Sequence, residues 1–169
     1  KQLGIRMIHF STDCVFDGKK GNYSESDPTN AEDIYGKTKA LGEIDYLDNV
    51  LTLRTSTIGR EIDSKHGLLE WVFAQRGKSL SGYSKAIYSG FPCELLAYLI
   101  DQYIIPKPNL WGIRHLSSSA IDKYSLVNMI VEKFDLNIDV KVDKNFAVDR
   151  SLNSNKIQNE LGLARFDWK

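Results

Sequence analysis

Short apolar runs alternate with longer amphipathic segments along this chain of 169 residues. Apolar runs bounded by polar turns are typical of central strands in a parallel sheet, whereas apolar residues spaced three and four apart indicate helices. The pattern predicts strands at 5–10, 50–58, 78–89, 111–117 and 138–142, and helices at about 30–47, 64–75, 92–103, 122–134 and 155–161. Strands and helices that alternate at the start, followed by shorter mixed elements, predict an α/β fold class.

The first predicted helix carries a candidate pair for proton transfer, Tyr35 and Lys39. Residues four apart share one face of a helix, so the phenol and the ammonium can reach the same small volume. A nearby cation favours the phenolate and makes the hydroxyl a usable proton donor near neutral pH. Thr12 is expected where the first strand emerges into a loop, the usual place for ligand chemistry in an open α/β sheet. Together the three side chains could bind a ketone and protonate its oxygen.

The start and the glycines of this helix lead to two further expectations. Asn30 is a plausible N-cap, with Asp33 in a first turn where the helix dipole favours acids. Gly36 and Gly42 each weaken a helix by roughly 1 kcal/mol relative to alanine. Glycines at that cost suggest that a ligand or a neighbouring backbone comes close to the helix.

The order of the motifs, more than any single one, gives the chain a family resemblance. The strand is followed by Ser11-Thr12-Asp13, an aromatic-Asp-Gly turn, Tyr23-Ser24-Glu25-Ser26-Asp27-Pro28, and Tyr35-Gly36-Lys37-Thr38-Lys39-Ala40-Leu41-Gly42-Glu43. This run resembles the extended short-chain dehydrogenase/reductase family, and within it the dTDP-4-dehydrorhamnose reductases. The likeness continues more loosely through Leu53-Arg54-Thr55-Ser56 to the C-terminus.

The resemblance implies the C-terminal part of a Rossmann-type doubly wound parallel sheet plus a small mixed α/β substrate-binding region. Residues 1–60 would be the remainder of the Rossmann-type domain with the Thr/Tyr/Lys site. Residues 61–169 would hold the remaining sheet elements and a C-terminal region that binds the sugar-nucleotide. The implied activity is NAD(P)H-dependent reduction of a 4-keto nucleotide-deoxysugar, in the synthesis of surface polysaccharide precursors.

The resemblance also implies roles for individual residues. The catalytic residues would be Thr12, Tyr35 and Lys39, and the cofactor (NADP or NAD) would contact Tyr35, Lys39 and Ser56. The substrate would contact Thr12, Asp13, Cys14, Phe16 and Arg150, the last through its diphosphate. Plainer interpretations stay open: Asp13 as a turn cap, Phe16 as a core residue, Ser56 as an ordinary strand residue, and Arg150 in a surface ion pair.

The charge and the cysteine content of the chain limit the kinds of partner that it is expected to bind. The 22 basic and 22 acidic residues give a formal net charge of zero, so neither a nucleic-acid track nor binding to an anionic membrane surface is indicated. Cys14 and Cys93 lie far apart and lack metal-ligand spacing, which favours a reduced, cytoplasmic setting without a metal site. The expected partners are a nucleotide-sugar and, as one option, further copies of the chain.

One expected motif is missing. Dinucleotide-binding domains of this kind carry a glycine-rich turn after their first strand, and no Gly-x-x-Gly-x-x-Gly run occurs here. We therefore expect the C-terminal part of a longer enzyme, with an open edge on the strand at 5–10 that invites pairing. An epimerase with the same three residues and tightly held NAD is one alternative, and a non-catalytic sugar-nucleotide-binding protein is another.

Overall fold

The structure is a computed structural model that describes residues 4–168. The strands are β1 (Met7–Thr12), β2 (Val50–Thr55), β3 (Thr57–Ile58), β4 (Ser79–Tyr88), β5 (Phe91–Pro92), β6 (Gly112–His115), β7 (Ile121–Asp122) and β8 (Asp139–Asp149). The helices are α1 (Ile34–Leu41), α2 (Leu68–Phe73), α3 (Cys93–Leu99), α4 (Lys123–Lys133) and α5 (Asn155–Leu161), with a 3-10 turn η1 (Asp13–Val15) and a π-helical turn η2 (Ile100–Ile104). None of the helices in this described part is long and apolar enough to cross a lipid bilayer.

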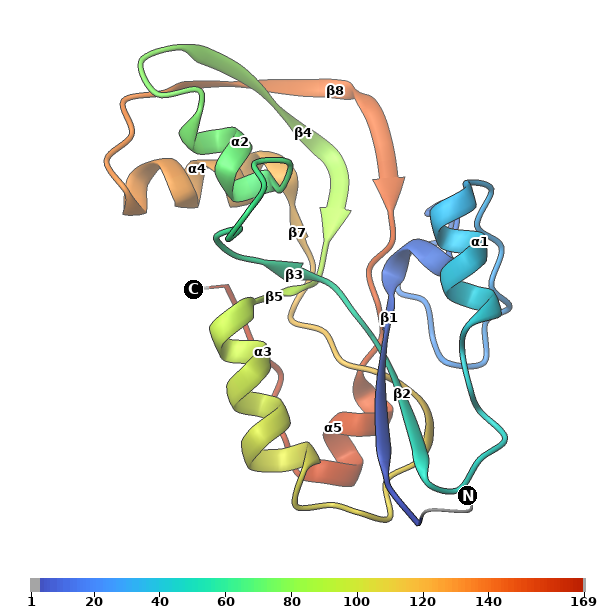
Figure 1. Cartoon of the computed structure of the whole chain (residues 1–169). Coiled ribbons are helices and arrows are strands. Elements are labelled where there is room, and N and C mark those ends of the chain that lie inside the picture. Colours follow the sequence, from blue (N-terminus) through green and yellow to red (C-terminus); the bar gives the residue numbers. More distant parts are fainter. Residues whose placement is uncertain (1–3, 169) are drawn as a thin grey trace.

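One of the two larger sheets is parallel, with three strands in the order β1-β2-β6 (Figure 1). Leu51 and Leu53 of β2 are fully buried in a core shared with α3, η2 and α5. Strand β1 lies at the edge, and Met7 and Phe10 on it remain 42% and 46% exposed. The predicted α/β class with a parallel sheet is confirmed, and β1 has the open edge that the sequence predicted.

The second of these sheets has the strand order β7-β4-β8. Its strands β4 and β8 run parallel as a long ribbon (Figure 1). Buried Leu80 packs in a core with α2 and α4. Gly82 lies on the same face, where a Cβ atom would come within 2.9 Å of Tyr124 in α4. The alternate residues of β4 (Ser81, Tyr83 and Lys85) are exposed, so this sheet has one covered and one open face.

Several predicted boundaries were wrong, each for a local reason. Helix α1 begins at Ile34 because the carboxylate of Asp33 caps it by accepting from the Gly36 amide at 2.8 Å. The Asn30 side chain instead accepts from the Asp17 amide at 2.9 Å. The helix ends before Gly42 rather than near residue 47.

Other elements differ in length. The predicted helix at 64–75 is confined to α2, because Glu61 holds the His66 amide at 2.7 Å and keeps the preceding segment in a loop. The predicted strand at 50–58 breaks at Ser56 into β2 and β3. The predicted edge strand at 138–142 continues to Asp149 as β8.

A buried ion pair connects the first sheet to the end of α1. The Arg54 guanidinium of β2 donates to both carboxylate oxygens of Glu43, at 2.8 and 2.7 Å. The side chains of Arg54 and Glu43 are only 3% and 6% exposed. Ser11 of β1 donates to the same carboxylate at 2.6 Å, and the guanidinium lies 5.1 Å from the centre of the Phe16 ring. The pair therefore holds β1, β2 and the segment after α1 together.

His115 of β6 completes this network. Burial, followed by the neighbouring Arg54 charge, lowers the pKa of His115 to about 3. The neutral ring lies 3.2 Å from Arg54 through Nε2 and 2.9 Å from the Tyr23 carbonyl oxygen through Nδ1. Since a guanidinium can only donate and a carbonyl oxygen can only accept, the tautomer is fixed with the proton on Nδ1.

We expect Arg54→Met to lower the free energy of unfolding by about 3–5 kcal/mol, because it leaves the Glu43 carboxylate buried without its cation. The measurement is urea denaturation followed by circular dichroism. Lys141→Met is the control: Lys141 is 3.9 Å from Asp139 and both side chains are about 70% exposed, so its removal should change stability by less than about 0.5 kcal/mol. A loss below 1 kcal/mol for Arg54→Met would contradict the role of the pair.

Stability should fall on acidification, from about pH 6.5 downward. The unfolded chain binds a proton at His115 near its ordinary pKa of 6.5, whereas the folded chain resists protonation down to about pH 3. Between these values the unfolded state holds the extra proton, and stability is lost as pH falls, by up to about 1.4 kcal/mol per pH unit. Denaturation midpoints between pH 7 and 5 measure this slope, which His115→Asn should flatten. An unchanged slope in that variant would place the titrating group elsewhere.

Candidate active site

Thr12 is the last residue of β1, and its hydroxyl caps the turn that follows. The hydroxyl oxygen accepts from the Cys14 amide at 3.1 Å, and its hydrogen is donated to Asp13 Oδ1, also at 3.1 Å. Thr12 and Asp13 are each 8% exposed. The predicted position of Thr12 at the carboxyl end of a strand is confirmed, and its hydrogen is shared with a carboxyl group that could release it to a ligand.

Helix α1 packs directly against this turn. A Cβ atom on Gly36 would come within 2.2 Å of the Cys14 carbonyl oxygen and 2.5 Å of the Ala31 Cβ, so only glycine permits the contact. The Lys39 ammonium donates to the Phe10 carbonyl oxygen at 2.6 Å, two residues before Thr12. The close approach predicted at Gly36 is confirmed. At Gly42 no neighbouring backbone from another element comes close, because a Cβ there would meet only carbonyl oxygens of its own helix, at 3.6 Å.

Tyr35 lies on α1 next to Gly36 and is 56% exposed. Its Cβ atom is about 5–6 Å from that of Lys39 because the two residues are one helical turn apart. The helix that carries the pair thus lies beside the end of β1 that carries Thr12. More than half of the Tyr35 side chain is exposed, so a ligand can reach it.

Arg150 reaches this site from the residue after β8. Its guanidinium donates to the Phe16 carbonyl oxygen at 2.9 Å and lies 3.6 Å from Cys14 Sγ. It also lies 3.7 Å from the Asp33 carboxylate, with its side chain 30% exposed. An ion pair is therefore present, as the plainer interpretation proposed, and the partly exposed guanidinium also lies beside two of the predicted pocket residues.

Burial governs the electrostatics of this turn. It raises the pKa of Asp13, although the Thr12 hydroxyl and the Arg150 charge oppose the rise. It also raises the pKa of the Cys14 thiol, to which the Asp13 charge adds. Cys14 is half-buried and free of any disulfide.

The prediction that Phe16 lines the substrate pocket is contradicted. Its side chain is fully buried, stacked on Tyr23 with ring centres 4.1 Å apart and edge-on to His115 at 5.8 Å. A ring enclosed in this way cannot touch a ligand. Phe16 instead belongs to the small core that packs beneath the turn after β1.

Thr55 Oγ1, a buried hydroxyl group at the carboxyl end of β2, has no hydrogen-bond partner within residues 4–168. Thr55 pairs with Thr12 across β1 and β2. Ser56 follows, and its carbonyl oxygen accepts from the Phe91 amide at 2.9 Å. Burial raises the pKa of Tyr88, the last residue of β4; a hydrogen bond with the Ser56 side chain opposes the rise, and the Asp13 charge adds to it. Tyr88 carries no sequence motif, so it could not be identified as a candidate from the sequence.

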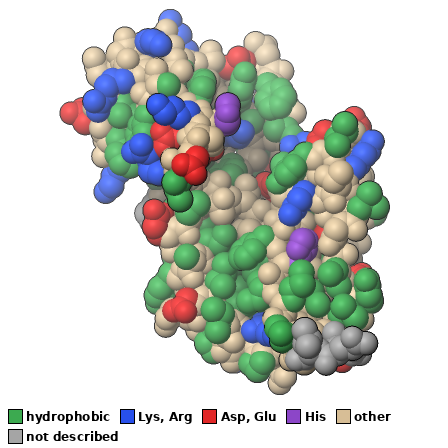
Figure 2. Space-filling view, in the orientation of Figure 1, with side chains coloured by type: hydrophobic (Ala, Val, Ile, Leu, Met, Phe, Trp, Pro, Cys, Tyr) green, Lys and Arg blue, Asp and Glu red, His purple; other side chains and the backbone are tan. Residues whose placement is uncertain are grey.

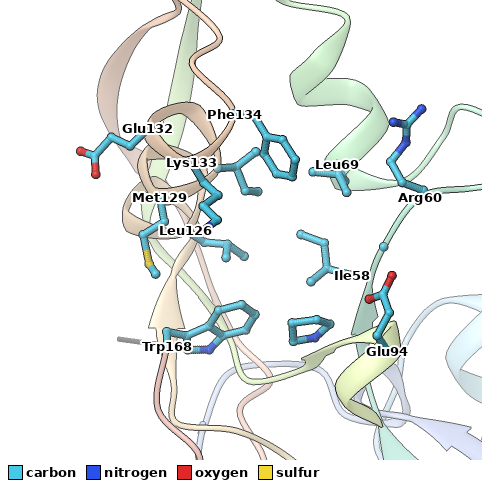
Figure 3. A pocket seen from close by; sticks show the side chains of 13 residues that line it. Ile58, Arg60, Leu69, Glu94, Leu126, Met129, Glu132, Lys133, Phe134 and Trp168 are labelled. Carbon is cyan, nitrogen blue, oxygen red and sulfur yellow. The ribbon is translucent and has the colours of Figure 1, made fainter. Parts of the chain in front are cut away.

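A cavity of about 820 Å³ lies apart from these residues, between α4, α2 and the start of α3 (Figure 3). Ile58, Leu69, Leu126 and Trp168 make its apolar walls, with charged side chains such as Arg60 at the rim (Figure 3). None of the predicted site residues lines it.

A parallel sheet with polar groups at the carboxyl ends of its strands and helices packed against it is an α/β arrangement of the Rossmann type. The chain belongs to the RmlD substrate binding domain family, whose model matches residues 1–154.

The relatives include named reductases. The chain is 40% identical over 83 residues to a dTDP-4-dehydrorhamnose reductase of Burkholderia thailandensis, a match that covers 47% of this chain and 23% of that protein. It superposes with a TM-score of 0.79 on the crystal structure of a hypothetical dTDP-4-dehydrorhamnose reductase from Sulfolobus tokodaii, at 29% identity over 97% of this chain and 61% of that one. The Bacillus anthracis reductase in complex with NADP shares the fold at a TM-score of 0.77 and 16% identity, covering 98% of this chain and 63% of that one. The chain thus spans less than two thirds of the length of each.

The packing of α1 on the turn can be tested with Gly36→Ala. We expect it to lower the free energy of unfolding by about 1–3 kcal/mol, because the new methyl group collides with the backbone of Cys14. Gly42→Ala is the matched control and should leave stability within about 0.5 kcal/mol, since its nearest neighbours are 3.6 Å away. Equal denaturation midpoints for the two variants would show that α1 does not rest on the turn.

Proposed function

We propose that the chain is the catalytic and substrate-binding part of an NAD(P)H-dependent reductase. The substrate would be a 4-keto nucleotide-linked deoxysugar such as dTDP-4-dehydrorhamnose, and the product a precursor of surface polysaccharide. The observation that carries this proposal is the hydrogen bond from Lys39 to the Phe10 carbonyl oxygen, which holds the Tyr–Lys face of α1 beside the strand end that carries Thr12.

In the proposed reaction Thr12 holds the ketone oxygen and Tyr35 protonates it. The Thr12 hydrogen turns from Asp13 to the ketone oxygen, while the oxygen of the hydroxyl stays fixed by the Cys14 amide. Tyr35 donates its proton as the carbonyl becomes an alkoxide. Lys39, one helical turn from Tyr35, would place its ammonium on the same face of α1 as the phenol. General acid catalysis of this kind contributes about 10²–10⁴-fold to the rate.

The cofactor would supply hydride to the carbonyl carbon when bound. The carboxyl ends of β1 and β2 fit its nicotinamide end, since the buried Thr55 hydroxyl has no partner in the described residues and could bond an amide. Lys39 and Ser56 would contact the same end. The chain contains no glycine-rich turn for the pyrophosphate, and we place that site in the part of the longer relatives that has no counterpart here.

Arg150, Asp13 and Cys14 would bind the substrate. The guanidinium is suited to paired hydrogen bonds with a diphosphate, for which it would exchange its 3.7 Å contact with Asp33. Burial raises the pKa of Asp13, and its carboxyl oxygens, one of which already accepts from Thr12, could bond a sugar hydroxyl. The zero net charge and two free cysteines fit a cytoplasmic enzyme with small-molecule partners. The open edge of β1 leaves room for pairing with a further segment or a second copy.

Tyr35→Phe tests the proposal in the protein at its natural length. Removing the hydroxyl should lower kcat at least about 10²-fold, because the ketone oxygen loses its proposed proton donor, and should leave nucleotide affinity within about twofold. The measurements are NAD(P)H oxidation with the 4-keto sugar-nucleotide and nucleotide binding by calorimetry.

Tyr98→Phe is the control for that change. Tyr98 is also about half exposed but lies on α3, away from the strand ends. Its loss of a hydroxyl should leave turnover unchanged. Normal turnover of Tyr35→Phe would remove Tyr35 from the mechanism.

A further inference from the structure

An exposed aromatic pair lies on the open face of the second sheet. Tyr83 of β4 and Phe146 of β8 are 39% and 49% exposed, and their ring centres are 5.1 Å apart at an interplanar angle of 56°. The other face of β4 is buried against α4, so these two rings are not part of that core.

An irregularity in β8 brings the two rings together. Tyr83 pairs with Asp143, and the next pair is Lys85 with Ala147, so β8 carries extra residues opposite Ser84. Such a bulge re-aims side chains locally, and bulges are frequent next to binding sites. Phe146 belongs to the bulged segment and contacts Tyr83 because of it.

The same strand leads from this pair to the candidate active site. Phe146 precedes Arg150 by four residues, about 13 Å along a strand. The end of β8 contacts the loop after β1, where a Cβ on Gly18 would come within 2.3 Å of Val148 and 3.1 Å of Arg150. Figure 2 shows the surface hollowed between the part that carries β4 and β8 and the part that carries α1.

We propose that Tyr83 and Phe146 form a stacking platform for the base of the nucleotide-sugar. This inference rests on the proposed function, since it extends the ligand from the sugar at Thr12 through the diphosphate at Arg150 to the base. The ribose, together with the reach of the Arg150 and Phe146 side chains, would span the stretch of about 13 Å between the two residues. Every base can stack on an aromatic side chain, because stacking does not involve the hydrogen-bonding edge of the base. The platform would therefore raise the affinity for the nucleotide without selecting a particular base.

A plainer role for the pair is a cross-strand contact that stabilises the sheet. The two roles differ in their response to a ligand. A stacking platform changes the affinity for a nucleoside diphosphate and leaves the affinity for a diphosphate without a base unchanged, whereas a structural contact affects both or neither.

The experiment compares two probes, thymidine diphosphate and inorganic pyrophosphate, by calorimetry on the protein at its natural length. Tyr83→Ala and Phe146→Ala should each weaken thymidine diphosphate binding on the order of 10-fold or more and leave pyrophosphate binding within twofold. Phe146→Trp keeps an aromatic surface and should retain near-normal binding. Trp111→Ala, which removes a 47% exposed ring from the segment before β6, is the control and should change neither affinity.

The outcomes separate this inference from the proposed function. Thymidine diphosphate binding that survives both alanine substitutions, or parallel losses for both probes, would overturn the platform and leave the reductase proposal standing. A wild-type protein that binds neither probe would contradict both. A leucine at either position that keeps the denaturation midpoint but loses thymidine diphosphate affinity would establish stacking as the cause.

Discussion

The buried ion pair between Arg54 and Glu43 is the constraint on which the arrangement of the candidate site depends. A guanidinium inside a sheet is costly unless its donors are matched, and here two go to one carboxylate and another reaches a neutral histidine. The carboxylate also binds Ser11 of β1. Since Glu43 is the second residue after α1, matching the charge of Arg54 fixes where α1 ends relative to β1.

Two further contacts fix the other end of α1. Asp33 caps its first turn, and the bare Gly36 backbone lies against the carbonyl of Cys14. The helix is thereby held at both ends against one strand, with Lys39 bonded to the strand backbone between them. This explains how eight residues, too short to be a stable helix in isolation, can present Tyr35 at a defined position. Tertiary contacts supply what helix propensity does not.

Much of the fold could be predicted from the sequence because apolar periodicity reports burial. It located most strands and helices, and the spacing of Tyr35 and Lys39 placed both on one helix face. The predicted helix boundaries were wrong where a side chain accepts a hydrogen bond from a nearby backbone amide, as Asp33 and Glu61 do. Apolar periodicity contains no information about such bonds. Phe16 was misjudged since an aromatic residue beside a site motif can face either the ligand or the core. Arg54 offered a signal that went unused: a charge inside an otherwise apolar strand requires a buried partner.

Cofactor stoichiometry tests the central claim most directly, because the same three residues could serve a reductase, an epimerase or a binding protein. The measurement is the amount of NAD(P)H oxidised per sugar-nucleotide converted by the protein at its natural length. A reductase oxidises one NAD(P)H for each product molecule, and that ratio is the predicted result. Product formed without net NAD(P)H consumption, or binding without conversion, would contradict the account.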